Sequence, residues 1–404
     1  MSIWLRSRKQ LTAEQEKAVM LSHTRHQVIV GMPGSEKTQV LLHRTQELRQ
    51  RLGVSADRFR IIVYTNVLKE YIRSALPLLD LPEETVETFD EWCSNFYRQH
   101  ILEPLSFNCE PLEPDFETIR EGVANWVEHE DFREPLLDFV LIEGGEDLPP
   151  VAYSIFRRVS RHVTVCINYQ QFIYRHSAPM MPVLQALGLR RRNVTWLHAS
   201  QYPQGVVALA AWCIEDATER RKYLARVKGE ITEYQTPMLY LAPTYEDEKH
   251  HLAEVLRQRL LLDSRIGIFI SNRSQVSILA RYLRDQGLEV ETQENMDFSS
   301  RRPKVMTFHS AKGLTFDSVF LPQLGASVFT YRTESEIYRL LFMGITCATR
   351  WVYLSAVQTD ALPLVQKMQL FVPEERLFVK KGPSGAQCVG KSVEREEDVL
   401  DFLL

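Results

Sequence analysis

The chain has 404 residues, of which 45% are hydrophobic and 25% are charged, so it has globular composition and room for two domains. These values exclude fibrous and intrinsically disordered proteins. Lys and Arg number 48 against 52 Asp and Glu, for a net charge of −4, which excludes an overall basic surface of the kind that binds nucleic acid. Contacts to DNA would have to come from local patches.

Short apolar runs alternate with amphipathic stretches through most of the chain. Strands are expected at Val28–Val30, Phe59–Tyr64, Phe139–Ile142, Val163–Ile167, Met238–Leu241, Ile266–Ile270, Val305–Phe308, Ser318–Leu321 and Trp351–Leu354. Because strands that alternate with helices form parallel sheets, the pattern predicts an α/β fold with two domains, each a parallel sheet with flanking helices.

Turn residues interrupt this pattern at Tyr202–Gly205, which places the first domain at residues 1–203 and the second at 204–362. Gln235–Pro237 is a competing boundary. Residues 363–404 are expected to form a C-terminal extension. In it, Lys380–Gly385 has the composition of a flexible linker and the acidic, apolar Glu394–Leu404 that of a docking helix.

The six cysteines show neither a C-x-x-C pair nor another metal-ligand spacing, so we expect free thiols in a reducing compartment and no zinc. The segment Met1–Arg6 lacks the apolar core of a signal peptide. No run of about 18 apolar residues is present to span a membrane. These features predict a cytoplasmic protein without a membrane partner.

The most specific chemical signal follows the first expected strand. Residues 31–38 read G-M-P-G-S-E-K-T, close to the phosphate-binding pattern G-x-x-x-x-G-K-[ST]. In such loops backbone N–H groups surround the phosphates, the lysine reaches the terminal phosphates and the hydroxyl binds Mg²⁺. The residues expected to hold ATP are Gly31, Gly34, Ser35, Glu36, Lys37 and Thr38.

Glu36 stands where the second glycine of the pattern belongs. It adds a side chain and a negative charge where the backbone approaches phosphate. Two like charges about 4 Å apart repel by about 4 kcal/mol at an effective dielectric of 20. Two alternatives stay open: Glu36 pairs with Lys37 and fills the site, or it turns to solvent and nucleotide still binds.

Further motifs, in the same order along the chain, resemble those of UvrD-like superfamily 1 DNA helicases. They are Leu11–Gln15 (adenine-reading glutamine), Ile61–Asn66 (T-x-N), Val86–Trp92 (T-F-H-S/W), Leu141–Leu148 (L-I/V-D-E-A-Q-D-L), Asn168–Tyr174 (G-D-x-x-Q-S-I-Y), Thr307–Asp317 (T-x-H-x-x-K-G-L-E-F-D) and Arg339–Ala348 (R-L-x-Y-V-A-x-T-R-A). The resemblance covers Leu11–Ser355 and implies two RecA-like P-loop NTPase domains. The intervals 96–139 and 205–304 are too short for the family's full accessory domains.

The resemblance also implies roles for individual residues. ATP and Mg²⁺ are the implied cofactors, with Gln15 and Arg339 contacting the nucleotide, Thr38 and Glu143 holding the metal, and Glu143 and Gln171 acting in catalysis. Single-stranded DNA is the implied partner, contacted by Thr65, Asn66, Thr88, Phe89, Trp92, Thr307, His309 and Lys312. For the aromatic Phe89 and Trp92, packing in the core is an equally good interpretation.

Several catalytic positions of the family are substituted here. Gly144 replaces the second acid of the metal-binding pair, and Cys347 replaces an arginine that can contribute about 10³ to 10⁵ in rate. Glu146 could supply a shifted carboxylate and Arg350 a replacement arginine. These substitutions argue against ATP hydrolysis and against a firmly bound Mg²⁺.

The leading hypothesis is therefore a degenerate helicase-like protein, impaired or inactive in ATP hydrolysis, that binds nucleic acid or a protein. A nuclease or toxin in bacterial defence or immunity is one such protein partner. The first alternative is an active ATP-dependent 3′–5′ DNA helicase or translocase with unusual motifs. The second is a pure adaptor that docks through its acidic C-terminal segment.

Overall fold

The computed structural model describes residues 4–101, 103–108, 113–169, 180–198, 202–227, 229–230, 236–371 and 376–383. The chain divides into two compact units. One comprises Met1–Ser200 with Met296–Ser300, and the other comprises Gln201–Asn295 with Arg301–Leu404.

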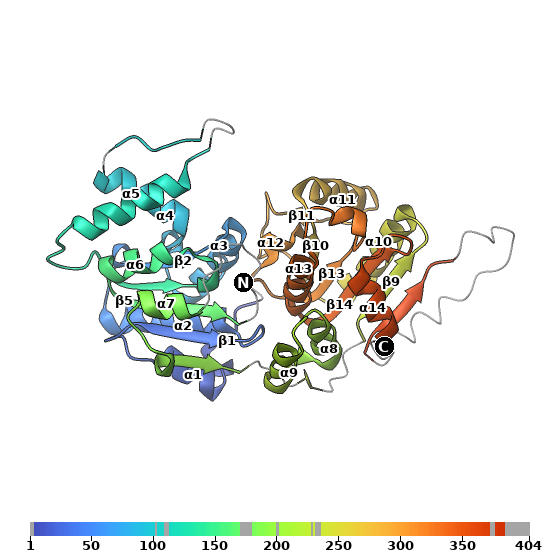
Figure 1. Ribbon diagram of the computed structural model, residues 1–404, viewed down its shortest axis with the longest axis horizontal. Coiled ribbons are helices and arrows are strands. Elements are labelled where there is room, and N and C mark those ends of the chain that lie inside the picture. Colours follow the sequence, from blue (N-terminus) through green and yellow to red (C-terminus); the bar gives the residue numbers. More distant parts are fainter. Residues whose placement is uncertain are drawn as a thin grey trace. The chain divides into compact units, whose positions relative to one another are not determined.

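The first unit is built on a six-stranded sheet in the order β3-β2-β4-β5-β1-β6, with every pair parallel (Figure 1). Its strands are β1 (Gln27–Gly31), β2 (Phe59–Val63), β3 (Val86–Thr88), β4 (Leu137–Ile142), β5 (Ser160–Asn168) and β6 (Val194–Leu197). Its helices are α1 (Ala13–Val19), α2 (Lys37–Leu52), α3 (Asn66–Arg73), α4 (Phe89–Phe96), α5 (Phe116–His129), α6 (Pro150–Val159) and α7 (Met180–Ala186). Alternate side chains of the central strands, such as Val28 and Val30, share one core with α4, α5, α6 and α7.

The second unit is built on a seven-stranded parallel sheet in the order β11-β12-β10-β13-β14-β9-β15. Its strands are β9 (Met238–Ala242), β10 (Ile266–Ile270), β11 (Glu291–Thr292), β12 (Lys304–Thr307), β13 (Phe316–Leu321), β14 (Ala348–Val357) and β15 (Phe378–Lys381). Its helices are α8 (Gln204–Trp212), α9 (Ala217–Arg226), α10 (Tyr245–Leu262), α11 (Arg273–Asp285), α12 (Phe308–Ala311), α13 (Glu334–Thr346) and α14 (Pro363–Phe371). A separate pair joins β7 (Tyr202–Pro203) to β8 (Gly229–Glu230).

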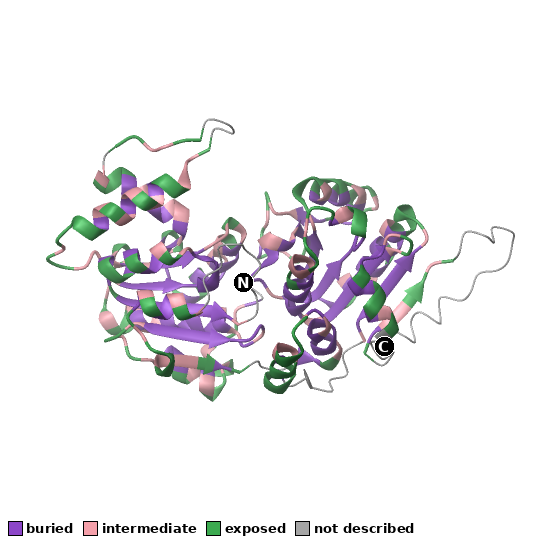
Figure 2. Ribbon diagram, in the orientation of Figure 1, coloured by how far each residue is buried: buried purple, intermediate pink, exposed green. Residues whose placement is uncertain are grey.

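The sheets are the buried layer of each unit, whereas the outer faces of the helices are exposed (Figure 2). Strands β1, β9 and β10 are buried along their whole length. This is why they appear in the sequence as continuous apolar runs rather than as alternating patterns. The α/β prediction and all nine expected strands are confirmed, each lying within or overlapping an observed strand.

Pattern reasoning missed the short edge strands β3, β6, β11 and β15. They contain only two to four residues, too few to establish a period. Strand β15 includes Lys380 and Lys381, which were expected in a linker, and pairs with β9. Lysines are common on sheet edges because they oppose further strand pairing. The second sheet therefore extends beyond the expected domain end at residue 362, while the expected docking helix Glu394–Leu404 lies outside the described residues.

Candidate nucleotide site

The loop between β1 and α2 keeps a backbone shape that favours glycine at two positions. Gly34 has φ 75°, and Glu36, the residue preceding α2, has φ 59° and ψ 38°. A non-glycine L-residue in this left-handed conformation costs about 1–2 kcal/mol. Such strain persists only where the surrounding structure imposes it, often at functional loops. Glu36 thus keeps the left-handed backbone conformation that glycine usually adopts, although its side chain is that of glutamate.

The amine of Lys37 is folded into this loop. Its Nζ donates hydrogen bonds to the carbonyl oxygens of Gly31 at 3.2 Å and Met32 at 3.0 Å, and to Ser35 Oγ at 3.2 Å. Burial lowers the pKa of Lys37, and the nearby carboxylates of Glu143 and others partly oppose that shift. A phosphate on the loop would replace these acceptors with a stronger, charged one.

The Glu36 carboxylate pairs with Arg6 rather than with Lys37, at 3.5 Å from the guanidinium. Arg6 belongs to an N-terminal segment that lies along α2, where Gln39 accepts from the Arg6 N–H at 3.0 Å and donates to the Trp4 carbonyl at 2.9 Å. The Trp4 indole stacks on Tyr71 with ring centroids 4.0 Å apart. Sequence reasoning missed this segment because no motif marks it.

Thr38 and Glu143 come together from different elements. Thr38 lies in the first turn of α2, Glu143 directly follows β4, and the Thr38 hydroxyl donates to Glu143 Oε1 at 2.8 Å. Glu143 is buried, with 2% of its surface exposed. A hydroxyl and a carboxylate are oxygen ligands of the kind that Mg²⁺ takes beside nucleotide phosphates, so this pair fits the metal that the resemblance implies.

Gly144 cannot complete an acid pair with Glu143. It has φ 67° and offers no side chain, and a Cβ built there would lie 3.5 Å from Asp147 Oδ2. The nearby Glu146 is fully buried and accepts from the Asn168 backbone N–H at 2.9 Å and its amide at 3.0 Å. Glu146 thus ties the end of β5 to the turn after β4. The other expected catalytic residue, Gln171, lies outside the described residues.

Gln15 lies beside the loop but is engaged in local structure. It is residue N3 of α1 and forms a capping box with Thr12, whose backbone N–H donates to Gln15 Oε1 at 2.8 Å. Its Nε2 donates to the Ser35 carbonyl at 3.2 Å. The side chain is 3% exposed, so in this arrangement it links α1 to the phosphate loop.

The three threonines expected to contact DNA are all helix N-caps that follow parallel strands. Thr65 accepts from the backbone N–H of the third residue of α3, Thr88 from that of α4 and Thr307 from that of α12. Asn66 is the exposed first residue of α3. Capping explains these threonines without a ligand, yet it also places them at the carboxyl edge of their sheets, where ligands of α/β proteins bind.

The aromatic residues expected on the DNA path are buried in the first unit. Phe89 is 3% exposed and Trp92 is 7% exposed. Both pack on Phe156, with ring centroids 5.8 and 4.8 Å away, respectively. A base stacks on an accessible ring face, whereas these rings fill the core beneath α4 and α6.

In the second unit, His309 and Lys312 lie in and after the short helix α12. Lys312 is buried, with 3% exposure. Burial, with the positive charges of Arg332 and Lys312, lowers the pKa of His309 to about 4, so the imidazole is neutral at pH 7. Arg339 is exposed on α13, where its guanidinium donates to Ser335 of the preceding turn.

Cys347 is the first residue after α13. It is buried at 3% exposure, and burial raises the pKa of its thiol to about 12. A thiol held in its neutral form is a poor nucleophile. Arg350, the alternative arginine, lies near the start of β14 and pairs with Asp263 at 3.4 Å.

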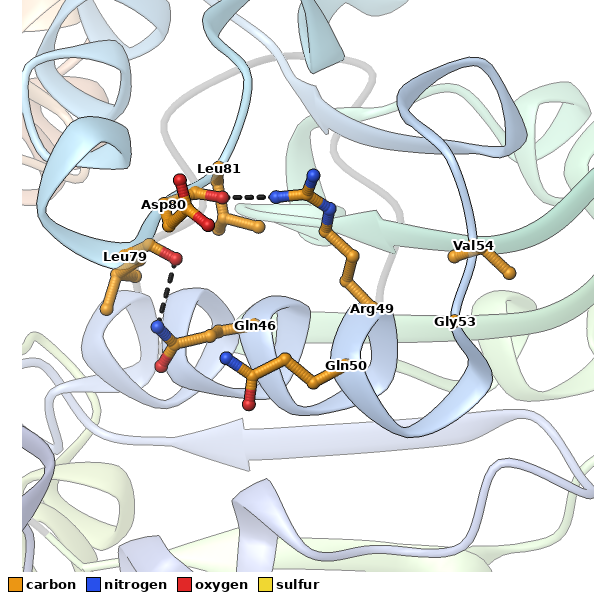
Figure 3. Close-up of a pocket in the computed structure, with 8 residues that line it drawn as sticks. All are labelled: Gln46, Arg49, Gln50, Gly53, Val54, Leu79, Asp80 and Leu81. Carbon is orange, nitrogen blue, oxygen red and sulfur yellow. Dashed lines mark hydrogen bonds between the residues drawn. The ribbon is translucent and has the colours of Figure 1, made fainter.

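A separate cavity of about 240 Å³ opens at the other end of α2 (Figure 3). There Gln46 donates to the Leu79 carbonyl at 2.9 Å and Arg49 donates to the Asp80 carbonyl. None of the described residues that line this cavity belongs to the phosphate loop. The loop and this cavity are therefore distinct features of the first unit.

No group of three or more His, Cys, Asp or Glu side chains in the described residues is arranged to hold a metal. Within the same residues, no helix combines the length and apolar character needed to cross a membrane.

Comparison with known proteins identifies the family. No curated protein matches the chain. A solved structure, the C-terminal domain of a possible DNA helicase from Lactobacillus plantarum WCFS1, is 19% identical with a TM-score of 0.35, and the match covers 45% of this chain and 98% of that one. The family model for the UvrD-like helicase C-terminal domain matches residues 53–359. This chain, with its two helix-flanked parallel sheets of the RecA-like class, therefore belongs to the UvrD-like helicase family.

Proposed function

We propose that this chain is a catalytically impaired helicase-family protein that binds nucleotide without turning it over and serves as a binding component on nucleic acid or a protein. The observation that carries the proposal is the contrast between Gly144 and its neighbours. Lys37 contacts the loop and Thr38 contacts Glu143, whereas Gly144, the residue after Glu143, has no side chain.

Binding and turnover need different parts of such a site. Lys37, Thr38 and the loop backbone suffice to hold phosphates and Mg²⁺ by charge and hydrogen bonding. Hydrolysis also needs a group that orients or deprotonates the attacking water and cations that stabilise the developing charge. Gly144 and the buried thiol of Cys347 supply neither.

An active ATP-dependent translocase is the rival function, and one observation favours it. The strained backbone at Glu36 keeps the left-handed shape that glycine gives such loops, and the Thr38–Glu143 contact is intact. In that case another carboxylate, such as Glu146, would have to leave its hydrogen bonds to Asn168 during turnover.

The deciding experiment titrates the full chain with a fluorescent ATP analogue and Mg²⁺ and measures phosphate release in the same samples, with and without single-stranded DNA. We expect binding that Lys37→Ala abolishes and no release above background in either condition. DNA-stimulated release that Lys37→Ala removes would establish the translocase instead. Absence of both binding and release would reject a nucleotide ligand and leave an interaction scaffold.

A further inference from the structure

A second cavity, of about 250 Å³, lies in the second unit at the carboxyl ends of its strands. Its lining comes from the loops and helices that follow β9, β10, β13 and β14: Tyr245, Glu248, Gln275, Gln323, Gly325, Ser327, Val328, Val357 and Asp360. None of these residues belongs to the site described above.

The sheet topology makes this edge a natural binding place. Strands β10 and β13 are neighbours, but the chain leaves β10 toward β11 and β12 on one side and leaves β13 toward β14 on the other. The connections therefore leave in opposite directions, and the cavity lining includes Gln275 from the connection after β10 and Gln323 from the connection after β13. Ligands of open α/β sheets bind at such switch points, outside the carboxyl ends of the strands.

The described lining has two acidic side chains and no basic one, and burial raises the pKa of one of them, Glu248, which disfavours its charged form. Glu248 and Asp360 contribute carboxylates, and none of the described residues that line the cavity is Lys, Arg or His. Glu248 is buried at 2% exposure and accepts from the Gln323 N–H and the Ser355 hydroxyl, both at 2.7 Å. Asp360 accepts from the Ser327 N–H at 3.1 Å and its hydroxyl at 2.5 Å.

Gln323 adds a hydrogen-bonding group without a partner. The side chain is 6% exposed, and its Nε2 donates to the Tyr245 hydroxyl at 2.6 Å. Its Oε1 has no hydrogen-bond partner among the described residues. A buried amide oxygen left in this state costs about 1–3 kcal/mol, which a donor brought by a ligand would recover. The residue also adopts φ 60°, so the backbone is strained where it presents this side chain.

We propose that this cavity binds a cationic nitrogen group, an ammonium or guanidinium, carried either by a small amine or by a basic side chain of a partner. Such a group offers several N–H donors and a positive charge that complements the two carboxylates. A divalent metal fits less well, since no described set of three acidic, His or Cys side chains surrounds the cavity. All described residues that line this cavity belong to the second unit, whereas the phosphate loop belongs to the first.

The test is calorimetric titration of the full chain with agmatine, which carries both cations, at low ionic strength. Asp360→Asn is expected to weaken binding about tenfold or more, because a charge-assisted hydrogen-bonding site loses its charge. Gln323→Glu is expected to tighten binding. The matched control is Asp285→Asn, which removes an exposed carboxylate of α11 outside the lining and should change nothing.

Thermal unfolding of each variant checks that it is folded. If Asp360→Asn does not fold, the affinity of Gln323→Glu for agmatine tests the proposal instead. A peptide with a single lysine and blocked ends, titrated in parallel, separates the two sources: tighter binding than agmatine indicates a partner side chain, and weaker binding a free amine. Equal affinities for wild type, both cavity variants and the control, or no heat at millimolar agmatine, would overturn the proposal.

Discussion

Glu36→Gly tests the strain and the charge at the phosphate loop. Glu36 occupies the left-handed region, where a side chain costs about 1–2 kcal/mol. Glycine removes this strain, but it also raises the entropy of the unfolded chain, which lowers the stability of the folded state by about 0.4–1 kcal/mol. The ion pair with Arg6, whose side chain is 46% exposed, contributes about 0–1 kcal/mol and is lost.

Glu36→Gln separates these effects, because it removes the charge and keeps the strained backbone. Comparison of the two variants cancels the lost ion pair and leaves a gain for Gly over Gln of about 0.8 kcal/mol on average. For a unit of this size, that corresponds to a rise in Tm of about 2–3 °C, measured by differential scanning calorimetry.

Nucleotide affinity should respond to charge in both variants. For a separation of about 6–8 Å between the Glu36 carboxylate and a phosphate, and an effective dielectric between 20 and 80, one repulsion is about 0.5–3 kcal/mol. Affinity for the fluorescent ATP analogue should therefore rise by about 2- to 100-fold in Glu36→Gln and at least as much in Glu36→Gly. Added salt should reduce the gain. Unchanged affinity in both variants would refute the view that Glu36 opposes phosphate binding.

Three further predictions concern other residues. Gly144→Glu should destabilise the first unit by about 1 kcal/mol, because the strain of about 1–2 kcal/mol for a side chain at φ 67° exceeds the roughly 0.4–1 kcal/mol gained from the lower entropy of the unfolded chain; an unchanged urea midpoint would contradict this. His162 is buried, receives hydrogen bonds at Nε2 from Arg44 and Thr164, and has a pKa lowered to about 3, first by burial and then by Arg44. In the unfolded chain His162 is protonated below about pH 6.5, whereas in the folded chain it stays neutral. At pH 5 this difference should lower the free energy of unfolding by about 2 kcal/mol. The urea midpoint of His162→Asn should then depend less on pH, and an identical pH dependence would exclude His162 as the cause. The buried thiols of Cys93, Cys166, Cys213 and Cys347 have raised pKa values and should resist a thiol reagent in the native protein, so that mass spectrometry finds no early label at these four positions. Early label at Cys347 would show that its surroundings are open.

The contacts of the phosphate loop could be predicted only in part. The sequence pattern identified the loop, its lysine and the odd residue Glu36, because spacing along one strand–loop–helix segment is a local property. It did not predict that Arg6 is the partner of Glu36, since the N-terminal segment reaches α2 only through side-chain packing. The sequence pattern also did not predict the cavity beside Gln323, which is lined by residues near the ends of four strands.

The sequence also did not determine whether the aromatic residues Phe89 and Trp92 are buried. From the sequence, Phe89 and Trp92 could lie on a nucleic-acid path or in the core, and in the structure both rings pack on Phe156 inside the core. Whether an aromatic side chain is buried depends on which helix covers it, and that is decided by contacts between distant segments.

By itself, the sequence determined the α/β class, the positions of the long strands and the order of the helicase-like motifs. These follow from local hydrophobic runs and from residues close together in the chain. Only the tertiary structure decided which polar side chains meet. Thr38 and Glu143 are 105 positions apart, and their contact exists because the carboxyl ends of parallel strands in one sheet lie at the same edge.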